Sequence, residues 1–433
     1  MFVSRHLDVN ALGHLTVEGR DTVELAEKYG TPLHLMSEGE IRDNCRRYRR
    51  TMEKYQGGGL VAYAGKALCC KALCQLVNEE EMGLDVVSAG ELFTAFSAGF
   101  PGERIILHGN NKTPDELAMA LEYGVGRVVV DNLTELRLLD VMAGAVGKTV
   151  GVMLRIKPGI DAHTHSFIRT GQIDSKFGFA LETGEAVAAV KEALGSKHLT
   201  LRGLHCHIGS QIFEAEPFRL AARVMLELMA QVRTETGTVI EELNLGGGFG
   251  IQYIQSQDPV PGDRCLGEVS RTVERVCKKL DFPLPFLLIE PGRSIVGSAG
   301  VTLYRVGGVK EIPGVRTYVS VDGGMTDNPR YALYRSEYTF LAAARASDPK
   351  TQAATIAGKC CESGDLLGEG VPIQEVAPGD LLAALCTGAY HYSMSSNYNR
   401  VPRPPVVLVG ERGDRVIIRR ERLEELVERD EDL

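Results

Sequence analysis

The sequence predicts an α/β protein with a (β/α)8 TIM-like barrel and a C-terminal mainly-β domain that is itself barrel-like. Two observations predict the barrel. Eight short apolar segments alternate with longer helix-like segments between residues 60 and 290, and polar side chains follow the ends of the apolar segments. The second domain is predicted because, after Arg293, alternating apolar runs are separated by Gly, Pro and Asp turns. An open doubly wound sheet is the competing architecture for the first part.

The expected strands are short apolar runs, and apolar residues recur at helical spacing between them, as with Leu117, Ala120 and Leu121. The expected strands are Leu60–Ala64, Asp85–Val87, Arg104–His108, Arg127–Asp131, Val150–Ile156, Leu201–His205, Glu242–Leu245 and Phe286–Glu290. The expected helices are Gly39–Glu53, Ala67–Met82, Ala89–Ala98, Pro114–Tyr123, Thr134–Val146, Thr183–Leu194, Pro217–Glu235 and Glu268–Lys279.

The placement of polar residues favours the barrel over the open sheet, because barrel enzymes build their sites at the C-terminal rim of the strands. These rim residues are Lys66, Asp85, His108, Asp131, Arg155, His205, His207, the glycines from Gly246, and Glu290. The polar segment Ala162–Lys176 is expected to be a loop on the same rim.

The domain boundaries follow from this change of pattern. We expect a barrel over residues 31–293 and a β domain formed by residues 1–30 and 294–433, which a possible strand at Leu15–Glu18 would complete. The β runs include Val301–Val306, Thr317–Val321, Val406–Val409 and Arg415–Ile418.

Composition excludes several classes of protein. The chain of 433 residues carries a net charge of −9 with no long Lys/Arg block, which argues against nucleic acid or an anionic membrane as a partner. Ten cysteines without a repeating framework suit free thiols in a reducing compartment. Because no leader or membrane-length apolar run is visible, we expect a soluble cytoplasmic protein.

The stretch Leu60–Leu68 contains the first candidate residue. Gly65 ends the apolar run, and Lys66 follows at the end of a strand expected to be buried. Desolvating an ammonium group costs free energy and lowers its pKa. Lys66 is therefore either a side chain whose head reaches water or a partly neutral amine that attacks a carbonyl.

Two further motifs follow the last strands. Gly246–Gly250 lacks the spacing of the dinucleotide fingerprint and of the Walker loop, so it is either a tight turn or a backbone cradle for phosphate. Its position late in the barrel favours phosphate. Glu290 and Arg293 form either an ion pair or a ring-nitrogen acceptor beside an anion-binding guanidinium.

The histidine and cysteine clusters allow more than one reading. His205 and His207 share one face of a strand while Cys206 points away, so even with His163 and His165 the zinc signal is weak, and we expect no metal. In Cys360–Asp365 the carboxylates disfavour a thiolate nucleophile and suit a thiol that donates a proton; a β turn is the alternative. The segments Asp322–Arg330 and Thr387–Tyr390 are likewise either turns or parts of a site, since each presents an anion-binding or aromatic group.

Seven ordered motifs, which cover nearly the whole chain, resemble the diaminopimelate decarboxylases, pyridoxal-phosphate decarboxylases with an alanine-racemase-like barrel. The resemblance implies a barrel with a C-terminal β domain, a homodimer with shared active sites, and conversion of meso-2,6-diaminopimelate to L-lysine and CO2, the last step of lysine biosynthesis. The motifs are Tyr63–Lys66, Gly83–Glu91, His108–Lys112, His205–Ser210, Glu290–Arg293, Cys361–Asp365 and Ser393–Tyr398.

The resemblance also implies roles for individual residues. Lys66 would hold pyridoxal 5'-phosphate as a Schiff base, His207 would stack on its ring, and Glu290 would hold the pyridine nitrogen protonated. Cys361 would donate the proton after CO2 leaves, from the partner subunit together with Glu362. The remaining implied cofactor-binding residues are Asp85, Ser210, Gly248, Gly292, Arg293 and Tyr390, and the implied substrate-binding residues are Arg293, Arg330, Tyr334, Glu362 and Tyr390.

One departure and two alternatives remain at this level. Gly358-Lys359-Cys360 stands where the family pattern suggests Gly-Pro and a bulky apolar residue, which puts the shape of that loop in doubt. The first alternative is a related decarboxylase of ornithine, arginine or a carboxylated polyamine precursor. A distal arginine and Glu362 favour diaminopimelate, because such a clamp would leave a buried charge unpaired with a simple diamine precursor. The second alternative, a non-catalytic cofactor-binding protein, is disfavoured by the presence of Lys66, Cys361 and Glu290.

Overall fold

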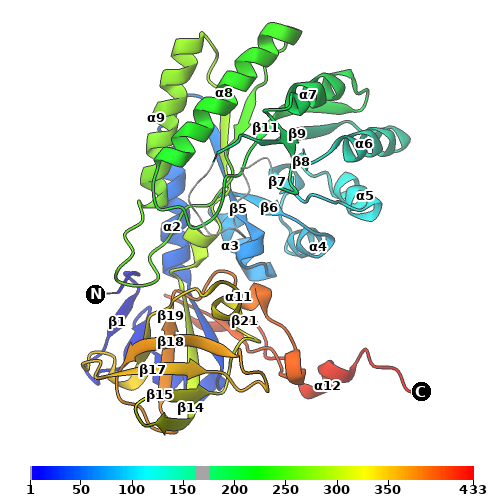
Figure 1. Ribbon diagram of the computed structural model, residues 1–433. Helices are drawn as coiled ribbons and strands as arrows, with labels where there is room; N and C mark the ends of the chain where they lie inside the picture. The colour runs from blue at the N-terminus through cyan, green and yellow to red at the C-terminus, as the bar shows by residue number, and fades with distance from the viewer. Residues whose placement is uncertain (1, 161–174) are drawn as a thin grey trace. The chain divides into compact units, whose positions relative to one another are not determined.

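A computed structural model describes residues 2–160 and 175–433. The chain divides into two compact units. The barrel unit comprises Asn44–Ile251 and Asp258–Ser294, and the sheet unit comprises Met1–Asp43, Gln252–Gln257 and Ile295–Leu433. Figure 1 shows the order of their elements along the chain.

The barrel unit contains a closed sheet of parallel strands. Neighbouring strands pair in the order β10-β9-β11-β12-β13-β5-β6-β7-β8, and β8 also pairs with β9, which closes the sheet. The predicted (β/α)8 barrel is therefore confirmed, and the open sheet is excluded. The strands are β5 (Gly59–Ala64), β6 (Gly83–Val86), β7 (Ile105–Leu107), β8 (Arg127–Val130), β9 (Val150–Lys157), β10 (Phe179–Ala180), β11 (Leu199–His205), β12 (Glu242–Asn244) and β13 (Phe286–Ile289).

Helices alternate with these strands, and Figure 1 shows α4 to α7 along the outside of the barrel. Thr113 begins α5 with a capping box, in which its side chain accepts from the Glu116 backbone while the Glu116 carboxylate accepts from the Thr113 backbone. The helices are α2 (Glu38–Met52), α3 (Lys71–Glu79), α4 (Ala89–Ser97), α5 (Pro114–Tyr123), α6 (Leu133–Ala145), α7 (Glu185–Gly195), α8 (Glu216–Thr236), α9 (Gly262–Leu280) and the short α10 (Arg293–Val296).

Two helices begin more than two residues away from their expected starts. The helix expected to begin at Ala67 begins at Lys71, because Leu68 and Cys70 are extended and a 3-10 turn occupies Gly65–Ala67. The last long helix begins at Gly262, six residues before the expected start. Apolar side chains from five strands fill the barrel centre, so its interior is a packed core. They are Ala62, Ile106, Val129, Met153 and Leu288.

The sheet unit is built on the long strand β14 (Gly300–Ile312). Its sheet runs β18-β17-β15-β14-β4-β20-β21, and β19 pairs with both β14 and β16. The other strands are β4 (Leu33–Ser37), β15 (Arg316–Val321), β16 (Phe340–Ala342), β17 (Gln352–Ala357), β18 (Leu366–Ile373), β19 (Leu381–Leu385), β20 (Val406–Gly410) and β21 (Gly413–Ile418).

The N-terminal segments differ from expectation. The strand expected at Leu15–Glu18 is β2 (Leu15–Val17), and it pairs with β1 (Leu7–Val9) and β3 (Arg20–Asp21) in a small separate sheet. The large sheet is instead joined by β4, which lies between β14 and β20. We expected residues 33–37 at the start of the barrel, but all five residues of β4 are buried in the sheet unit. The run Leu-His-Leu-Met-Ser mixes apolar and polar residues, so its sequence alone does not reveal which sheet it joins.

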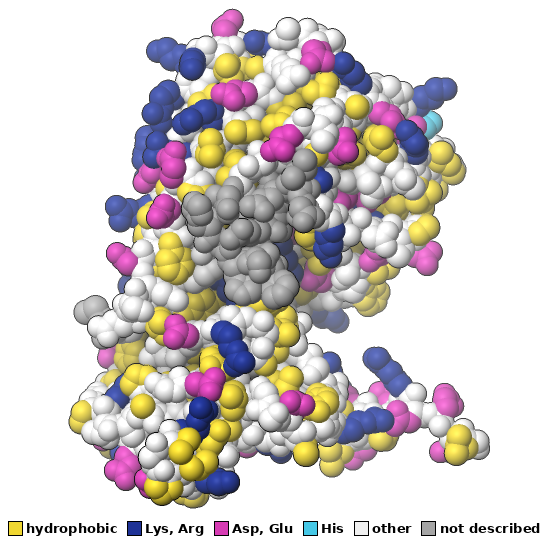
Figure 2. Space-filling view, viewed as in Figure 1, with side chains coloured by type: hydrophobic (Ala, Val, Ile, Leu, Met, Phe, Trp, Pro, Cys, Tyr) yellow, Lys and Arg dark blue, Asp and Glu magenta, His cyan; other side chains and the backbone are white. Residues whose placement is uncertain are grey.

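The surface carries both signs of charge. Figure 2 shows Lys and Arg side chains interspersed with Asp and Glu over the visible face, in keeping with the net charge of −9. Within residues 2–160 and 175–433, no helix combines the length and the apolar character needed to cross a bilayer.

Candidate active site

Lys66 lies in a short turn directly after β5. The 3-10 turn Gly65–Ala67 carries it, and its neighbours Gly65 and Ala67 are buried while the Lys66 side chain is exposed. A Cβ atom on Gly65 would lie 2.9 Å from the Asp85 backbone oxygen, so the turn packs closely against β6. The Lys66 side chain reaches solvent although the strand before it is buried. An accessible amine on a fixed turn can reach a carbonyl carbon.

A buried carboxylate, Glu290, follows β13 and accepts three N–H groups. His108 Nε2 lies 2.7 Å from Oε1, His205 Nε2 lies 3.2 Å from Oε2, and Asn244 Nδ2 lies 2.6 Å from Oε1. Burial raises the pKa of Glu290, but the two imidazoles outweigh it and hold this pKa well below its usual range. Burial lowers the pKa of His205 to about 3, so His205 donates as a neutral imidazole. Glu290 is therefore a fixed negative charge at the rim.

Asp85 behaves in the opposite way. It is buried on β6, and burial, reinforced by the charge of Glu290, raises its pKa despite the opposing effect of His108. Its Oδ1 has no hydrogen-bond partner among the described residues and lies 3.9 Å from His108 Nε2. An unsatisfied buried carboxyl oxygen costs free energy, and a polar group of a bound molecule can satisfy it.

Ligand atoms of His108, His205 and Glu290 lie within 4.8 Å of one another, a spacing that a metal ion could use. However, the Asn244 amide donates to the same Glu290 oxygen that His108 contacts, and these donors compete with a metal ion for the lone pairs of that oxygen. The cluster suits a protonated ring nitrogen better than a metal. Cys206 is fully buried, and His163 and His165 lie outside the described residues.

The loops after β11 and β12 form a backbone cradle. Gly248 has φ +107°, and a Cβ there would lie 2.2 Å from the Gly209 carbonyl oxygen, so only glycine fits. The Ile212 N–H donates to the Gly248 carbonyl at 3.0 Å, which joins the two loops. Close-packed glycine backbone of this kind leaves N–H groups accessible to an anion.

A third loop, after β13, adds side-chain donors to the cradle. Arg293 Nη2 donates to Ser210 Oγ at 3.0 Å, and Arg293 is buried. At Gly292, a Cβ would lie 2.9 Å from the Ala64 Cβ, so this loop packs against the end of β5, beside Lys66. Loops after the last strands of such barrels recurrently bind phosphate.

His207 faces the same cradle. The Gly247 N–H donates to His207 Nδ1 at 3.2 Å, so Nδ1 carries no proton. Burial, together with the positive charge of Lys66, lowers the pKa of His207 well below its usual value. A neutral imidazole with a fixed orientation can stack on an aromatic ring.

The motif His108–Lys112 has a structural explanation. The buried Lys112 ammonium lies 2.7 Å from Glu135 Oε1 and donates to the backbone oxygens of Val129 and Gly109 at 2.6 and 2.8 Å. These bonds fix the loop that carries His108 and compensate the burial of the charge.

In the sheet unit, Arg330 is a buried cation between aromatic rings. It lies at the start of α11 (Arg330–Tyr334), with its guanidinium carbon 5.2 Å from the Tyr334 ring centre and 5.4 Å from that of Tyr390. Its Nε donates to the Tyr338 hydroxyl at 3.0 Å. The guanidinium is therefore held in a fixed direction, as recognition of a carboxylate requires.

Cys361 and Glu362 are exposed on the loop between β17 and β18. The buried Asp365 carboxylate organises this loop, because it accepts from the Cys360 N–H at 2.8 Å and the Met325 N–H at 2.6 Å. Burial and Asp365 raise the pKa of Cys360 to about 11. Asp365 binds backbone N–H groups of this loop, not the side chain of Lys359. The difference from the family pattern at Gly358-Lys359-Cys360 therefore leaves these Asp365 contacts in place.

The barrel unit thus brings eight of the expected site residues to one rim. They are Lys66, Asp85, His207, Ser210, Gly248, Glu290, Gly292 and Arg293. Arg330, Tyr334 and Tyr390 gather within the sheet unit, and Cys361 and Glu362 lie on a separate loop of that unit. Asn244 was not predicted from the sequence, although its position at the end of β12 was a usable signal. The sequence placed His108 on the rim but did not predict its contact with Glu290.

Comparisons with known proteins agree with this geometry. The family model described as "Pyridoxal-dependent decarboxylase, pyridoxal binding domain" matches residues 38–297. The chain is 47% identical to the diaminopimelate decarboxylase of Bacillus subtilis over 430 residues, covering 99% of this chain and 98% of that protein. It is 48% identical to the protein of the same name from Halalkalibacterium halodurans over 430 residues, again 99% and 98% of the two chains.

A solved structure is similar over the whole length. The crystal structure of diaminopimelate decarboxylase from M. jannaschii in co-complex with L-lysine aligns with a TM-score of 0.92 at 35% identity, covering 100% of this chain and 99% of that one.

Proposed function

The chain belongs to the diaminopimelate decarboxylases, and from this premise we infer that it converts meso-2,6-diaminopimelate to L-lysine and CO2, the last step of lysine biosynthesis. It is a carboxy-lyase that depends on pyridoxal 5'-phosphate. The observation that carries this function is the arrangement at the barrel rim, where an accessible amine, a fixed carboxylate and a glycine cradle face one site. When bound, pyridoxal phosphate supplies an electron sink for the electron pair that departing CO2 leaves on the substrate.

The residues of the barrel unit fit this cofactor. We assign Lys66 to its carbonyl carbon and Glu290 to its ring nitrogen, because a carboxylate with a strongly lowered pKa keeps a nearby ring nitrogen protonated. The loops of Ser210, Gly248, Gly292 and Arg293 would hold the phosphate.

His207 and Asp85 complete the proposed cofactor site. His207 would lie against the ring face as a neutral imidazole, which its Gly247 contact favours. The buried, unsatisfied Oδ1 of Asp85 leaves room for one further polar contact to the bound molecule.

We propose the following residues as the substrate contacts. Arg330, with Tyr334 and Tyr390, would hold the distal carboxylate of the substrate, with Arg293 assisting, and Glu362 would hold the distal ammonium. Tyr390 would also touch the cofactor. The fixed guanidinium of Arg330 supports this role, since a rigid fork binds a carboxylate with little loss of entropy.

We propose Cys361 as the proton donor to the carbon that has lost CO2. In this proposal the enzyme is a homodimer, and each Cys361 and Glu362 serve the site of the partner subunit. The exposure of both residues on their own chain supports a role toward another molecule. We also propose a cytoplasmic location, which ten free cysteines support, since oxidising compartments favour disulfides.

The decisive experiment incubates the purified protein with pyridoxal phosphate and a panel of amino acids, scoring CO2 and product. We expect L-lysine from meso-diaminopimelate and no turnover of ornithine, arginine or carboxylated polyamine precursors. Lys66→Ala is the matched control and should lose cofactor attachment, seen as loss of the visible absorbance band. Turnover of ornithine without lysine formation would overturn the substrate assignment.

A further inference from the structure

The backbone of Cys361 is held by a side chain from a distant loop. The Cys361 N–H donates to Asn399 Oδ1 at 2.8 Å. Asn399 has φ +52°, the left-handed conformation that asparagine tolerates better than most residues, and this conformation lies within the turn Tyr398–Arg400. The neighbouring Cys360 N–H is bound from the other side by Asp365. Two side chains therefore fix successive N–H groups of the loop that carries the thiol.

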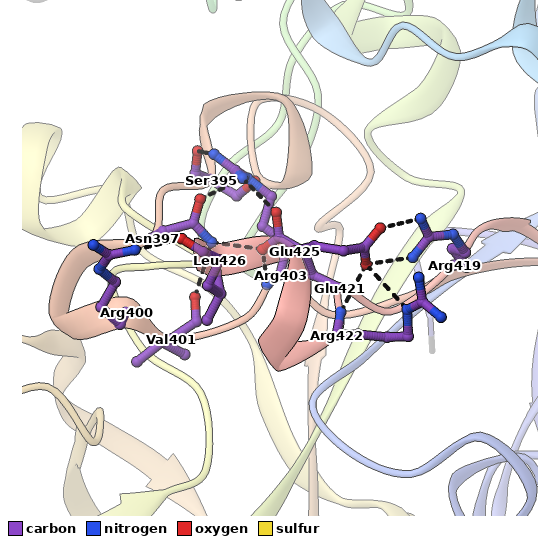
Figure 3. A network of polar contacts seen from close by, with 10 residues as sticks. All are labelled: Ser395, Asn397, Arg400, Val401, Arg403, Arg419, Glu421, Arg422, Glu425 and Leu426. Atoms are coloured by element: carbon purple, nitrogen blue, oxygen red, sulfur yellow. Dashed lines mark hydrogen bonds and ion pairs between the residues drawn. The ribbon is translucent and has the colours of Figure 1, made fainter. Parts of the chain in front are cut away.

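Figure 3 shows a polar network that stabilises the segment around the turn Tyr398–Arg400. Before the turn, Asn397 Nδ2 donates to Glu421 Oε2 at 2.5 Å, and Arg403 Nη1 donates to Asn397 Oδ1 at 2.5 Å. Arg403 also lies 3.1 Å from Glu421 Oε1 and donates to Ser395 Oγ at 3.1 Å. Both Asn397 and Arg403 are half-buried, which makes these bonds less screened than surface pairs.

The C-terminal segment Arg419–Asp430 supplies the other half of this network. Arg400, next to Asn399, donates to the Leu426 carbonyl and lies 2.8 Å from Asp430 Oδ2. Glu425 caps the N-terminus of the short helix α12 (Leu423–Val427), because its carboxylate accepts from the Arg422 N–H. The same carboxylate also accepts from the Arg419 side chain. Part of this segment therefore contacts the turn that holds the thiol loop.

We propose that Asn399 is a positioning residue for Cys361 and that the C-terminal segment Arg419–Asp430 keeps Asn399 in place. The physical reason is entropic: Ser363 and Gly364 of this loop are exposed, and holding an exposed loop in one conformation costs conformational entropy. Hydrogen bonds made in advance reduce the cost of bringing the thiol to the reacting carbon. A misplacement of about 1 Å at such a group can lower a rate by about 100-fold.

This inference rests on the proposed role of Cys361, so its test needs a readout that does not depend on turnover. The probe is iodoacetamide, applied to the holoenzyme, with the alkylated position assigned by peptide mass spectrometry. Asn399→Gly keeps the left-handed backbone and removes the acceptor, whereas Asn399→Asp keeps the acceptor. Glu421→Ala removes the contacts with Asn397 and Arg403, which stabilise the turn without touching Cys361. Arg345→Ala is the control, because it breaks an exposed pair with Asp380 elsewhere in the same unit.

In Asn399→Gly and Glu421→Ala, we expect iodoacetamide to alkylate Cys361 at least threefold faster than in the unmodified enzyme. In Asn399→Asp and Arg345→Ala, the alkylation rate of Cys361 should stay within twofold of the unmodified enzyme. In turnover of diaminopimelate, Asn399→Gly should lower kcat about tenfold with KM and cofactor affinity unchanged. Its solvent deuterium isotope effect on kcat should rise as proton donation becomes slower. Unchanged alkylation in Asn399→Gly, or an equal increase in Arg345→Ala, would overturn the positioning role. A protein that alkylates as expected but releases no lysine would contradict the proposed function and leave the positioning role supported.

Discussion

The Nε2 atom of His108 lies 2.7 Å from Oε1 of Glu290, although 182 residues separate them in the chain. This contact makes Glu290 a charge with a fixed direction, since His205 and Asn244 bind the same carboxylate. A carboxylate that is already desolvated and oriented needs no reorganisation when a positive ring nitrogen approaches it.

Removing the charge of Glu290 should therefore impair catalysis more than folding. We expect Glu290→Gln to lower kcat/KM by about 100- to 1000-fold, the range seen when one preorganised electrostatic group is removed. His108→Gln should cost less, about tenfold, because Glu290 retains its other two donors. Steady-state decarboxylation rates, with bound cofactor measured by absorbance, check both. Glu192→Gln, which alters an exposed pair with Arg137, is the control and should leave the rate unchanged.

The glycine cradle predicts a defect in cofactor affinity. In Gly248→Ala the new methyl group would approach the Gly209 oxygen to 2.2 Å at a backbone angle unfavourable for alanine, so the loop must shift. We expect the Kd for pyridoxal phosphate to rise at least tenfold in an absorbance titration. Gly195→Ala has open space around its Cβ and is the matched control. Equal affinities in the two variants would place the phosphate elsewhere.

A shared active site predicts complementation between inactive variants. Lys66→Ala and Cys361→Ala should each be inactive alone. After subunit exchange of equal amounts, half of the dimers are mixed and each mixed dimer has one intact site, so about a quarter of the original activity should return. Exchange is monitored independently with differently tagged subunits. If the subunits exchange and no activity returns, each site uses its own Cys361.

A buried histidine in the sheet unit predicts how stability depends on pH. Burial lowers the pKa of His34 to about 4 in the folded protein, below the value of 6.5 for an exposed histidine. As pH falls from about 6.5 to 4, His34 becomes protonated in the unfolded chain but stays neutral in the folded chain. The free energy of unfolding therefore decreases across this pH range. At about 1.4 kcal/mol per pKa unit, the loss is roughly 3 kcal/mol.

The measurement is the free energy of unfolding by urea at several pH values. His34→Asn keeps a hydrogen-bonding side chain near Thr302 without titrating in this range. We expect its stability to fall less between pH 7 and 4 than that of the unmodified protein. Parallel pH profiles for the two proteins would show that His34 does not contribute. His205 acts in the same direction in both proteins, since burial lowers its pKa to about 3.

The sequence predicted the barrel well because its signal is local and repeated. All eight expected strands are present, and α5 spans Pro114–Tyr123 as expected, since a cap, a proline and an apolar stripe define it. The boundary errors have local causes. The turn at Gly65–Ala67 delays α3, and α9 starts early over residues with no strong apolar pattern.

The sequence could not place β4 or the C-terminal segment. Leu33–Ser37 is short and could join either sheet, and only its pairing with β14 and β20 shows that it belongs to the sheet unit. The segment Arg419–Asp430 is highly charged, and charge alone does not identify its partners. Its contacts with Arg400 arise from chain segments that only the fold brings together.

The sequence by itself determined the fold class, the family and the residue types of the site, because apolar periodicity and ordered motifs are properties of neighbouring residues. The tertiary structure alone decided the environment of those residues: Lys66 is exposed, Glu290 is held by two imidazoles and an amide, and Cys361 is bound by Asn399. Burial, pKa and orientation depend on atoms contributed from distant positions, and their effects fall off within a few ångströms, so no local pattern encodes them.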